Sequence, residues 1–590
     1  MSCFVGIDLG TTNTSVTYLD PETGSLTQYK IHQMISEGLM DARDILPSVL
    51  YTPADGEFSE GDLDLPWEKS PSWIVGEMAR RQWSRAGHRV VHSAKSWLCH
   101  GALGGKDPIL PFKSTIEDKV SAYEATLKII SHLKSSWNYD ALHERVPARL
   151  EELDVVVTIP ASFDPAAREL TLEAAREAGL EKLRLLEEPQ AALYSWLQDQ
   201  SQDWRENLQV GNRILVCDVG GGTTDFSLIE AVDEEGHLAL RRVAVGNHIL
   251  LGGDNMDLAL AHLLRARLEE NEQKPDDLQF GSLLGQAREA KEEILSGSKE
   301  EVHVVLTGSG SSLFASSMET HLRREDLETV VLQGFFSPCE LSDLPASSRA
   351  AGLREVGLAY AQDPSILKYL AQFLSQNLSG NGEDFPTTIL FNGSMFQASL
   401  LQEKILSTLN SWSVANRGEE FQLLGGIEFP LAVSRGAAYY SWVSQGEGIR
   451  IKASLPYSYY IGVEKAQMAI PGMKPELSLV CTAPYGMEEG TSAHLDGELF
   501  YLVHGENVQF RLFRSPVRRD ELGTRTDFTQ DEFEEISCLE KELAADSQTE
   551  FVPVELESVA TEIGTLEVWC QGAGATQEKW KLEFHVREQS

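Results

Sequence analysis

FVGIDLGTTNTSVTY, residues 4–18, is a run of apolar and β-branched residues that is interrupted by a Gly-Thr-Thr-Asn turn. β-Branched residues favour strands and Gly and Asn favour turns, so the stretch predicts a β-hairpin. A second copy of the pattern, ILVCDVGGGTTDFSLI, occupies residues 214–229. Each copy places an aspartate, Asp8 or Asp218, near the end of its first strand. We therefore expect the chain to be internally duplicated.

The two glycine turns have the composition of phosphate-binding loops. Without a Cβ atom, glycine lets backbone N–H groups converge on phosphate oxygens, and Thr hydroxyls add further donors. One such turn alone is more often a plain hairpin turn, but two matched turns that face each other would clamp a triphosphate. Asp8 and Asp218 stand where they could hold Mg²⁺ through water, because Mg²⁺ prefers oxygen ligands and keeps most of its hydration shell. The sequence has neither a P-loop motif nor a strand-linked G-x-G-x-x-G, which argues against both of those nucleotide-binding classes.

Strands and helices alternate through the first three quarters of the chain. Residues 155–160 predict a buried strand, and Asp164 with Pro165 predicts the start of a helix that ends at Gly179. This alternation is typical of an α/β fold. Further predicted helices cover residues 263–268 and 287–295, and further predicted strands cover 302–306 and 388–391.

The pattern changes to a period of two after about residue 447, as in WKLEFHVR at 580–587, which predicts half-buried strands. We therefore predict an α/β domain over residues 1–446 and an all-β domain over residues 447–590. The acidic stretch 518–548 predicts a loop with a short helix, and no helical lid is expected over the β domain. Other predicted strands are 499–503, 508–512, 552–556 and 566–570.

The composition limits which partners the protein can bind and which cell compartment it can occupy. At 590 residues the chain exceeds the size of a single hydrophobic core. The 50 Lys and Arg residues against 90 Asp and Glu give a net charge of −40, which repels nucleic acid and anionic membranes. The seven cysteines form no C-x-x-C pair, and the first residues lack the basic and apolar regions of a signal peptide. These features predict a cytoplasmic protein with no nucleic-acid or membrane partner.

Taken in order along the chain, several motifs resemble those of the heat shock protein 70 (DnaK-like) chaperone family. The two glycine turns with their aspartates look like the family's two phosphate loops. The chain is identified as a divergent member, and the resemblance spans about residues 4–440. The other matching motifs are SAKSWL at 93–98, TIPASF at 158–163 with Arg168, LEEPQAA at 186–192 and LGGDNMD at 251–257.

The resemblance implies a two-lobed actin-like ATPase domain, of duplicated ribonuclease H-like architecture, that binds ATP and Mg²⁺. It implies that Lys95 positions the attacking water and that Asp8, Glu188 and Asp218 hold hydrated Mg²⁺. The implied ligands of the β- and γ-phosphates are Thr11, Thr12, Asn13 and Thr223. Further implied nucleotide-binding residues are Gly10, Gly220, Gly221, Gly222, Thr224, Gly252, Gly253, Arg288, Lys291, Ser296, Gly393 and Ser394.

Two segments depart from the family pattern. Phe396 stands where the family has an arginine that contacts the base. Residues 446–452, GEGIRIK, are basic and free of leucine where the family has an acidic, leucine-rich linker. The β domain could bind an extended peptide by strand addition.

The function that the resemblance implies is that of an ATP-hydrolysing chaperone, which couples nucleotide state to a protein client and works with a co-chaperone. A nucleotide-gated scaffold with little turnover and one dedicated partner is the first alternative. A small-molecule kinase of the same superfamily is a second. A filament-forming relative is disfavoured, because a charge of −40 opposes self-association.

Overall fold

The structure is a computed structural model of the 590-residue chain. It describes residues 3–99, 105–200, 208–234, 237–247, 249–306, 317–346, 358, 360–378, 384–445, 451–452, 455, 457–465, 477–487, 491–495, 499–503, 507–515, 518–529, 532–542, 551–561, 565–572 and 579–585. The chain divides into two compact units, residues 1–239 with 243–450, and residues 451–590 with the short piece 240–242. That piece belongs to the second unit because Leu240 and Arg241 pair in parallel with β19 (Ile451–Lys452).

The first lobe of the first unit is built on a sheet that contains the predicted N-terminal hairpin. Strands β1 and β2 pair antiparallel, and β10 and β11 extend the sheet in parallel on the other side of β1. The prediction of a hairpin at residues 4–18 is confirmed. The sheet has the order β11-β10-β1-β2-β3, with β6 also paired to β2. Its strands are β1 (Phe4–Leu9), β2 (Asn13–Asp20), β3 (Ser25–Tyr29), β6 (Ile45–Pro47), β10 (Asp154–Ile159) and β11 (Leu183–Glu187).

The second lobe is built on a sheet with the same pattern of pairing. Its central strand β12 pairs antiparallel with β13 and in parallel with the much later strand β17. In both lobes the glycine turn therefore joins the central strand to its antiparallel neighbour. The strands are β12 (Arg213–Val219), β13 (Thr224–Glu234), β14 (His237–Val245), β17 (Thr388–Asn392) and β18 (Gln422–Leu423).

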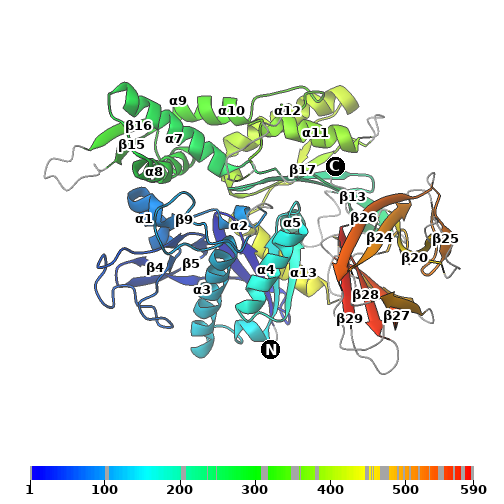
Figure 1. Cartoon of the computed structure of the whole chain (residues 1–590). Coiled ribbons are helices and arrows are strands. Elements are labelled where there is room, and N and C mark those ends of the chain that lie inside the picture. Colours follow the sequence, from blue (N-terminus) through cyan, green and yellow to red (C-terminus); the bar gives the residue numbers. More distant parts are fainter. Residues whose placement is uncertain are drawn as a thin grey trace. The chain divides into compact units, whose positions relative to one another are not determined.

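Helices and short sheets surround these two sheets (Figure 1). Helix α4 begins as predicted: Pro165 is its first residue, and the Asp164 side chain accepts a hydrogen bond from the Ala167 N–H at 2.8 Å. The helices are α1 (Glu77–Ala86), α2 (Ala94–Trp97), α3 (Ala122–Leu142), α4 (Pro165–Glu177), α5 (Glu188–Gln200), α7 (Gly253–Glu270), α8 (Asp277–Leu295), α9 (Arg324–Leu327), α10 (Gln333–Phe335), α11 (Ile366–Asn377), α12 (Ser399–Arg417) and α13 (Ala432–Val443). The short strands are β4 (Ile31–Ser36), β5 (Leu39–Arg43), β7 (Leu50–Tyr51), β8 (Ile74–Val75), β9 (Val90–Val91), β15 (Glu301–Leu306) and β16 (Met318–Arg323).

Helix α13 is packed unusually closely against the first lobe. A side chain at Gly6 of β1 would place its Cβ atom 2.2 Å from the Ser434 carbonyl oxygen, and one at Gly436 would meet the Ala191 carbonyl of α5 at 1.7 Å. The Ser434 hydroxyl also hydrogen bonds to the hydroxyls of Ser15 and Thr17, each at 2.9 Å. Glycine at both positions therefore lets backbones approach where a methyl group could not fit.

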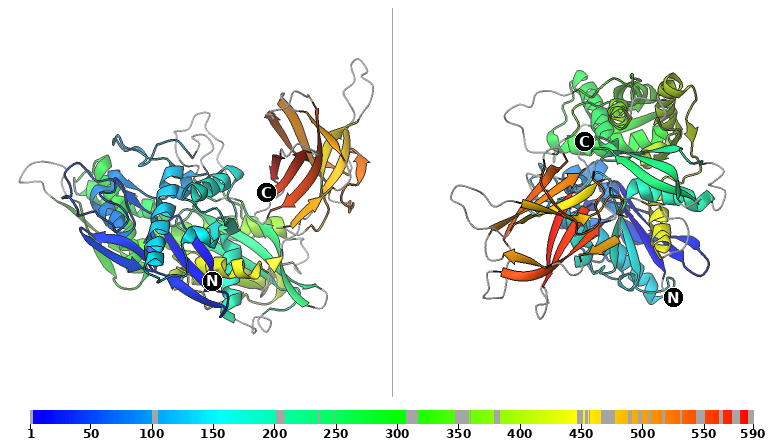
Figure 2. Two further views of the ribbon diagram at one scale, coloured as in Figure 1. Left: turned by 90° about the horizontal axis from the view of Figure 1, so that it is seen from below. Right: turned by 90° about the vertical axis from the view of Figure 1, so that its right-hand side faces the viewer.

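The second unit, coloured yellow to red in Figure 2, consists of two sheets with a large apolar core and a smaller apolar cluster. Its described residues contain strands and no helix. The sheets have the orders β25-β21-β20-β24-β26 and β22-β27-β28-β29, with β23 also paired to β27. The strands are β20 (Ser458–Glu464), β21 (Leu477–Ala483), β22 (Thr491–His494), β23 (Phe500–Val503), β24 (Asn507–Ser515), β25 (Arg525–Asp527), β26 (Glu534–Glu542), β27 (Phe551–Ala560), β28 (Thr565–Gly572) and β29 (Lys579–His585).

One prediction in this unit is wrong. The acidic stretch 518–548 forms strands β25 and β26 among its described residues, and not a loop with a short helix. Arginines on the neighbouring strand neutralise its carboxylates: Arg511 pairs with Glu535 at 2.6 Å and Arg514 with Glu534 at 2.8 Å. Cross-strand pairs of opposite charge stabilise a sheet, so an acidic segment can form a strand next to a basic strand.

Two further observations concern the chain as far as it is described. No helix in these ranges combines the length and the apolar character that a membrane crossing requires. The cysteines whose side chains are described are free thiols; they are Cys3, Cys99, Cys217, Cys339, Cys481 and Cys570.

Candidate functional site

The two glycine turns face each other across the cleft between the lobes. Each turn is closed by the same backbone hydrogen bond, from Gly10 N–H to Asn13 O at 3.1 Å and from Gly220 N–H to Thr223 O at 2.9 Å. A side chain at Gly221 would place its Cβ atom 2.0 Å from Thr12 Oγ1. The sequence predicted two such turns, and the structure brings them into contact.

The first turn is fixed by a residue that the sequence analysis missed. Ser48, directly after β6, donates its hydroxyl to Gly10 O at 2.8 Å, and its backbone N–H donates to Thr12 O at 2.8 Å. Its hydroxyl also lies 3.0 Å from that of Thr14. No local pattern in the sequence distinguishes Ser48 from an ordinary serine after a short strand.

The second turn is stabilised by backbone hydrogen bonds from the start of α7. Gly253 N–H donates to Gly220 O at 3.1 Å, and Asp254 N–H donates to Gly221 O at 2.7 Å. A side chain at Gly252 would place its Cβ atom 2.7 Å from those same two carbonyl oxygens. These contacts give the LGGDNMD motif a physical role, which is to fix the second glycine turn.

Two other predicted residues also support this loop. Thr224 is buried and donates its hydroxyl to Leu251 O at 2.7 Å. Gly393 has φ 98°, and a Cβ atom there would lie 2.2 Å from Val219 O. Only glycine fits that position, because the backbone conformation is left-handed and the space is already filled.

Buried carboxylates lie close to both turns. Asp8 accepts a hydrogen bond from Thr158 Oγ1 at 3.2 Å, and Asp218 accepts one from Asn392 Nδ2 at 2.7 Å. Burial, reinforced by the charge of Glu188, raises the pKa of Asp8 to about 7. Burial and the same Glu188 raise the pKa of Asp218 well above its ordinary range. The carboxylates therefore repel one another and favour a positive charge between them.

Asp225, which the sequence analysis did not single out, belongs to this group. It is 3% exposed, and burial raises its pKa to about 7 despite hydrogen bonds from Ser162 and Thr223. Its Oδ1 atom has no hydrogen-bond partner among the described residues. Its place in GGGTTDF, one residue beyond the predicted Thr223 and Thr224, was the available signal.

An oxygen-only set of repelling carboxylates fits a hard divalent cation such as Mg²⁺. In the part of the chain that is described, no three His, Cys, Asp or Glu side chains are arranged to bind a metal ion directly.

Lys95 lies beside the carboxylates. Its Nζ atom forms an ion pair with Glu188 and lies 5.7 Å from the centroid of the Phe163 ring. The neighbouring Glu187 is paired instead with Arg168, at 3.6 Å. The two adjacent glutamates thus have different partners, and Glu188 is the one that faces Lys95. Lys95 is 6% exposed, so its charge is strongly felt by the groups around it.

A cavity of about 480 Å³ extends from the two turns into the second lobe. Its volume is within the range of small-molecule and cofactor sites. The predicted residues that line it are Thr12, Asn13, Gly221, Gly253, Arg288, Lys291, Ser296 and Ser394. The other predicted residues, Asp8, Gly10, Thr11, Lys95, Glu188, Asp218, Gly220, Gly222, Thr223, Thr224, Gly252 and Gly393, are not part of its lining.

The cationic groups of the cavity are already paired with acidic ones. Lys291 Nζ lies 2.6 Å from Asp257 Oδ1, and Arg288 lies 3.8 Å from Asp254 and 3.2 Å from Glu292. Asp254 also accepts a hydrogen bond from the Ser93 hydroxyl, which belongs to the other lobe. Asp254 therefore lines the cavity and joins both lobes, a role that the sequence did not predict.

Phe396 does not line this cavity. It is fully buried and packs against Phe391, with ring centroids 4.6 Å apart, and against Phe429 at 6.4 Å. Its neighbours Met395 and Gln397 line the cavity instead. The departure from the family pattern therefore serves the hydrophobic core of the second lobe.

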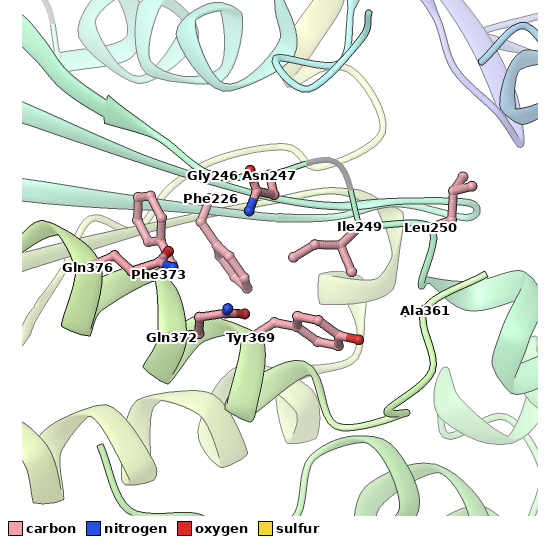
Figure 3. Close-up of a pocket in the computed structure, with 10 residues that line it drawn as sticks. All are labelled: Phe226, Gly246, Asn247, Ile249, Leu250, Ala361, Tyr369, Gln372, Phe373 and Gln376. Atoms are coloured by element: carbon pink, nitrogen blue, oxygen red, sulfur yellow. The ribbon is translucent and has the colours of Figure 1, made fainter. Parts of the chain in front are cut away.

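A smaller cavity of about 140 Å³ lies between the second sheet and α11 (Figure 3). Figure 3 shows Phe226 and Ile249 extending towards Tyr369 and Gln372 of α11. It has less than a third of the volume of the cavity beside the turns, so we do not assign the principal ligand to it.

A family model described as Hsp70 protein matches residues 71–341 of the chain. The matched range contains Lys95, Glu188, the second glycine turn and the helix with Arg288 and Lys291. The matched range begins after the first glycine turn. It ends before Gly393, Ser394 and the second unit.

Proposed function

Because this chain belongs to the Hsp70 family of nucleotide-binding chaperones, which implies an actin-like ATPase fold, we propose that it binds and hydrolyses ATP with Mg²⁺. We propose further that nucleotide state is coupled to a protein client or partner held by residues 447–590. The observation that supports this most directly is the pair of facing glycine turns beside buried carboxylates and Lys95.

Each group in the site has a specific task under this proposal. Backbone N–H groups of the two turns, with the side chains of Thr11, Thr12, Asn13 and Thr223, bind the phosphates. Asp8, Glu188 and Asp218 would hold Mg²⁺ through water, and the ion would supply positive charge against the phosphates. Lys95 orients the attacking water, and Glu188 fixes the position of the Lys95 ammonium group. Catalysis then consists mainly of orientation and charge neutralisation.

The adenosine end is assigned to the cavity in the second lobe. Arg288, Lys291 and Ser296 of the cavity lining are assigned to the adenosine, and the Arg288 guanidinium lies 5.4 Å from the centroid of the Trp83 ring. Asp254 holds the lobes together through its hydrogen bond from Ser93, so it slows the release of a bound nucleotide.

Coupling to a client, a role for a co-chaperone and a cytoplasmic location are parts of the same proposal. Among the described strands of the second unit, β25, β26, β22 and β29 stand at the ends of the sheet orders, where an extended peptide can add as a further strand. One sequence observation favours the scaffold alternative: the basic segment 446–452 replaces the acidic linker through which the family couples its domains.

ATP binding and single-turnover hydrolysis with Mg²⁺ would test the proposal, comparing the wild type with Lys95→Met and Asp218→Asn. We expect Lys95→Met to lose hydrolysis by a factor of about 100 or more and to keep ATP binding. Asp218→Asn should lose the dependence on Mg²⁺. Lys274→Met, at an exposed lysine with no described side-chain contact, is the matched control and should behave like the wild type.

Failure to bind ATP would refute the proposal. Tight binding without turnover would select the scaffold, and turnover only with added sugar would select the kinase. The coupling part is tested separately, with a permanently unfolded protein such as reduced, carboxymethylated lactalbumin as the probe. Its affinity should change between ATP and ADP, and equal affinities would contradict coupling.

A further inference from the structure

A cavity of about 280 Å³ in the first lobe lies outside the site described above, and no residue that lines it belongs to that site. Its walls come from β4, from the segment 63–75 and from one face of α3. It is larger than the engineered cavity of roughly 150 Å³ that is known to bind benzene. It has room for an aromatic ring with a polar substituent.

The segment 63–75 is a formed wall and not a loose loop. Asp64 accepts hydrogen bonds from Lys69 Nζ at 2.8 Å and from the Ser70 N–H at 3.0 Å. Leu65 and Glu68 exchange backbone hydrogen bonds of 2.9 and 3.2 Å. The turn is therefore fixed by its own polar groups, which leaves its apolar side chains free to face the cavity.

Two tryptophans and several aliphatic residues form the apolar part of the lining. Leu63, Leu65 and Ile74 are buried, and Trp67 and Trp73 are partly exposed. The Trp67 ring meets the His132 ring edge to face at 5.7 Å, which joins the segment to α3. These surfaces suit the flat face of an aromatic ligand.

Trp67 also carries a buried Nε1–H group that has no acceptor among the described residues. A ligand oxygen, reached after a small rotation of the indole, would satisfy this donor.

The polar side of the cavity is one face of α3. Lys128, Ser131 and Ser135 follow each other at spacings of three and four residues, so their side chains lie on the same side of the helix. Within the described ranges none of these three side chains makes a hydrogen bond or an ion pair. They are donors without acceptors.

Other polar side chains of the same helix are fully used by the fold. Ser136 hydrogen bonds to the Tyr29 hydroxyl and to the His32 N–H, each at 2.9 Å. Lys134 donates to Ala178 O at 2.8 Å. The contrast indicates that the helix face with Lys128 is available to bind a ligand.

Lys128 is the cationic residue of the lining, and the exposed Glu68 is the anionic one. His132 adds no charge near neutral pH, because burial lowers its pKa to about 4. Its Nε2 atom lies 3.0 Å from the His32 carbonyl oxygen, to which it donates. One ammonium and two hydroxyls on a single helix face are suited to a carboxylate.

From this arrangement we propose that the cavity between segment 63–75 and α3 binds an aromatic carboxylate. The ring lies between Trp67 and Trp73, and the carboxylate accepts from Lys128, Ser131 and Ser135. The ligand is either a free small acid or the C-terminal carboxylate of a polypeptide that ends in an aromatic residue.

Calorimetric titration of the full chain with indole-3-acetate and with the neutral indole-3-acetamide tests the proposal. The acid should bind about tenfold more tightly than the amide, because only the acid forms a charge-assisted contact with Lys128. Lys128→Met should remove this preference while leaving amide binding unchanged. Lys274→Met is the control and should keep the preference.

A second pair of probes separates the two sources of the carboxylate. A hexapeptide that ends in tryptophan, with a free or an amidated C-terminus, should show the same preference if the source is a polypeptide; binding of indole-3-acetate alone identifies a small acid. Failure of the wild type to bind either acid, or equal binding of acid and amide, would overturn the proposal. ATP binding should be the same in Lys128→Met and wild type, which keeps this test independent of the nucleotide site.

Discussion

Replacement of Asp225 by asparagine should stabilise the protein in the absence of ligands. Asn has the same shape as Asp but cannot ionise. The pKa of Asp225 is about 7 in the folded protein against 3.8 for a free aspartate. One pKa unit corresponds to about 1.4 kcal/mol, so ionising this group in the folded state costs about 4 kcal/mol more than in the unfolded chain. We expect Asp225→Asn to gain about 2 kcal/mol or more at pH 8, since the amide weakens the hydrogen bonds from Ser162 and Thr223.

Because folding raises the pKa of Asp225, the stability difference between the wild type and Asp225→Asn depends on pH in a definite direction. Below pH 3.8 the Asp225 carboxyl is protonated in both states and contributes nothing. Between pH 3.8 and about 7 only the unfolded state loses the proton, so the wild type loses stability as the pH rises. Above about pH 7 both states are ionised and the loss is complete. The advantage of Asp225→Asn should therefore grow from pH 4 to pH 7 and then stay constant.

Thermal unfolding of ligand-free wild type and Asp225→Asn, followed from pH 5 to pH 8.5, measures this difference. Asp55→Asn, at an exposed aspartate with no described side-chain contact, is the matched control and should leave the curve unchanged. Added Mg²⁺ should stabilise the wild type more than Asp225→Asn, because the cation neutralises the same charge. A gain that does not vary with pH, or a loss of stability at pH 8, would refute this reasoning.

Three further predictions concern packing, protonation and the cleft. Gly436→Ala should cost about 3 kcal/mol or more, because its Cβ atom would lie 1.7 Å from a backbone carbonyl, whereas Gly425→Ala, with no atom within 4 Å, should cost far less; denaturant unfolding compares them. Burial lowers the pKa of His92 to about 3, so its C2–H resonance should not titrate above pH 5, and a midpoint near 6.5 would contradict the structure. Ser93→Ala removes the hydrogen bond to Asp254 across the cleft, so a fluorescent ATP analogue should dissociate several-fold faster in stopped flow, and an unchanged rate would contradict the role of Asp254.

Much of the local structure could be predicted from the sequence. Both glycine-turn hairpins follow from β-branched runs around Gly and Thr, and the start of α4 follows from Asp164 and Pro165. The period of two in the last quarter predicts strands such as β28 and β29. These features depend on neighbours in the chain, so local patterns suffice.

The features that escaped prediction depend on distant parts of the chain. Ser48 supports a turn 38 residues earlier, and Asp254 meets Ser93 from 161 residues away. The raised pKa of Asp225 comes from burial and from Glu188, which no local pattern shows. The acidic strand β26 is acceptable only because Arg511 and Arg514 lie on the next strand. Tertiary contacts override local tendencies in each of these cases.

The position of α13 has a consequence for synthesis on the ribosome. Its Ser434 bonds to Ser15, which is 419 residues earlier in the chain. At roughly 5 to 20 residues per second, about 20 to 80 s pass between the appearance of the first strands and that of their last partner. During this time the backbone beside Gly6 is uncovered and β1 and β2 are exposed to other chains. The first lobe therefore completes its packing only after α13 has been made.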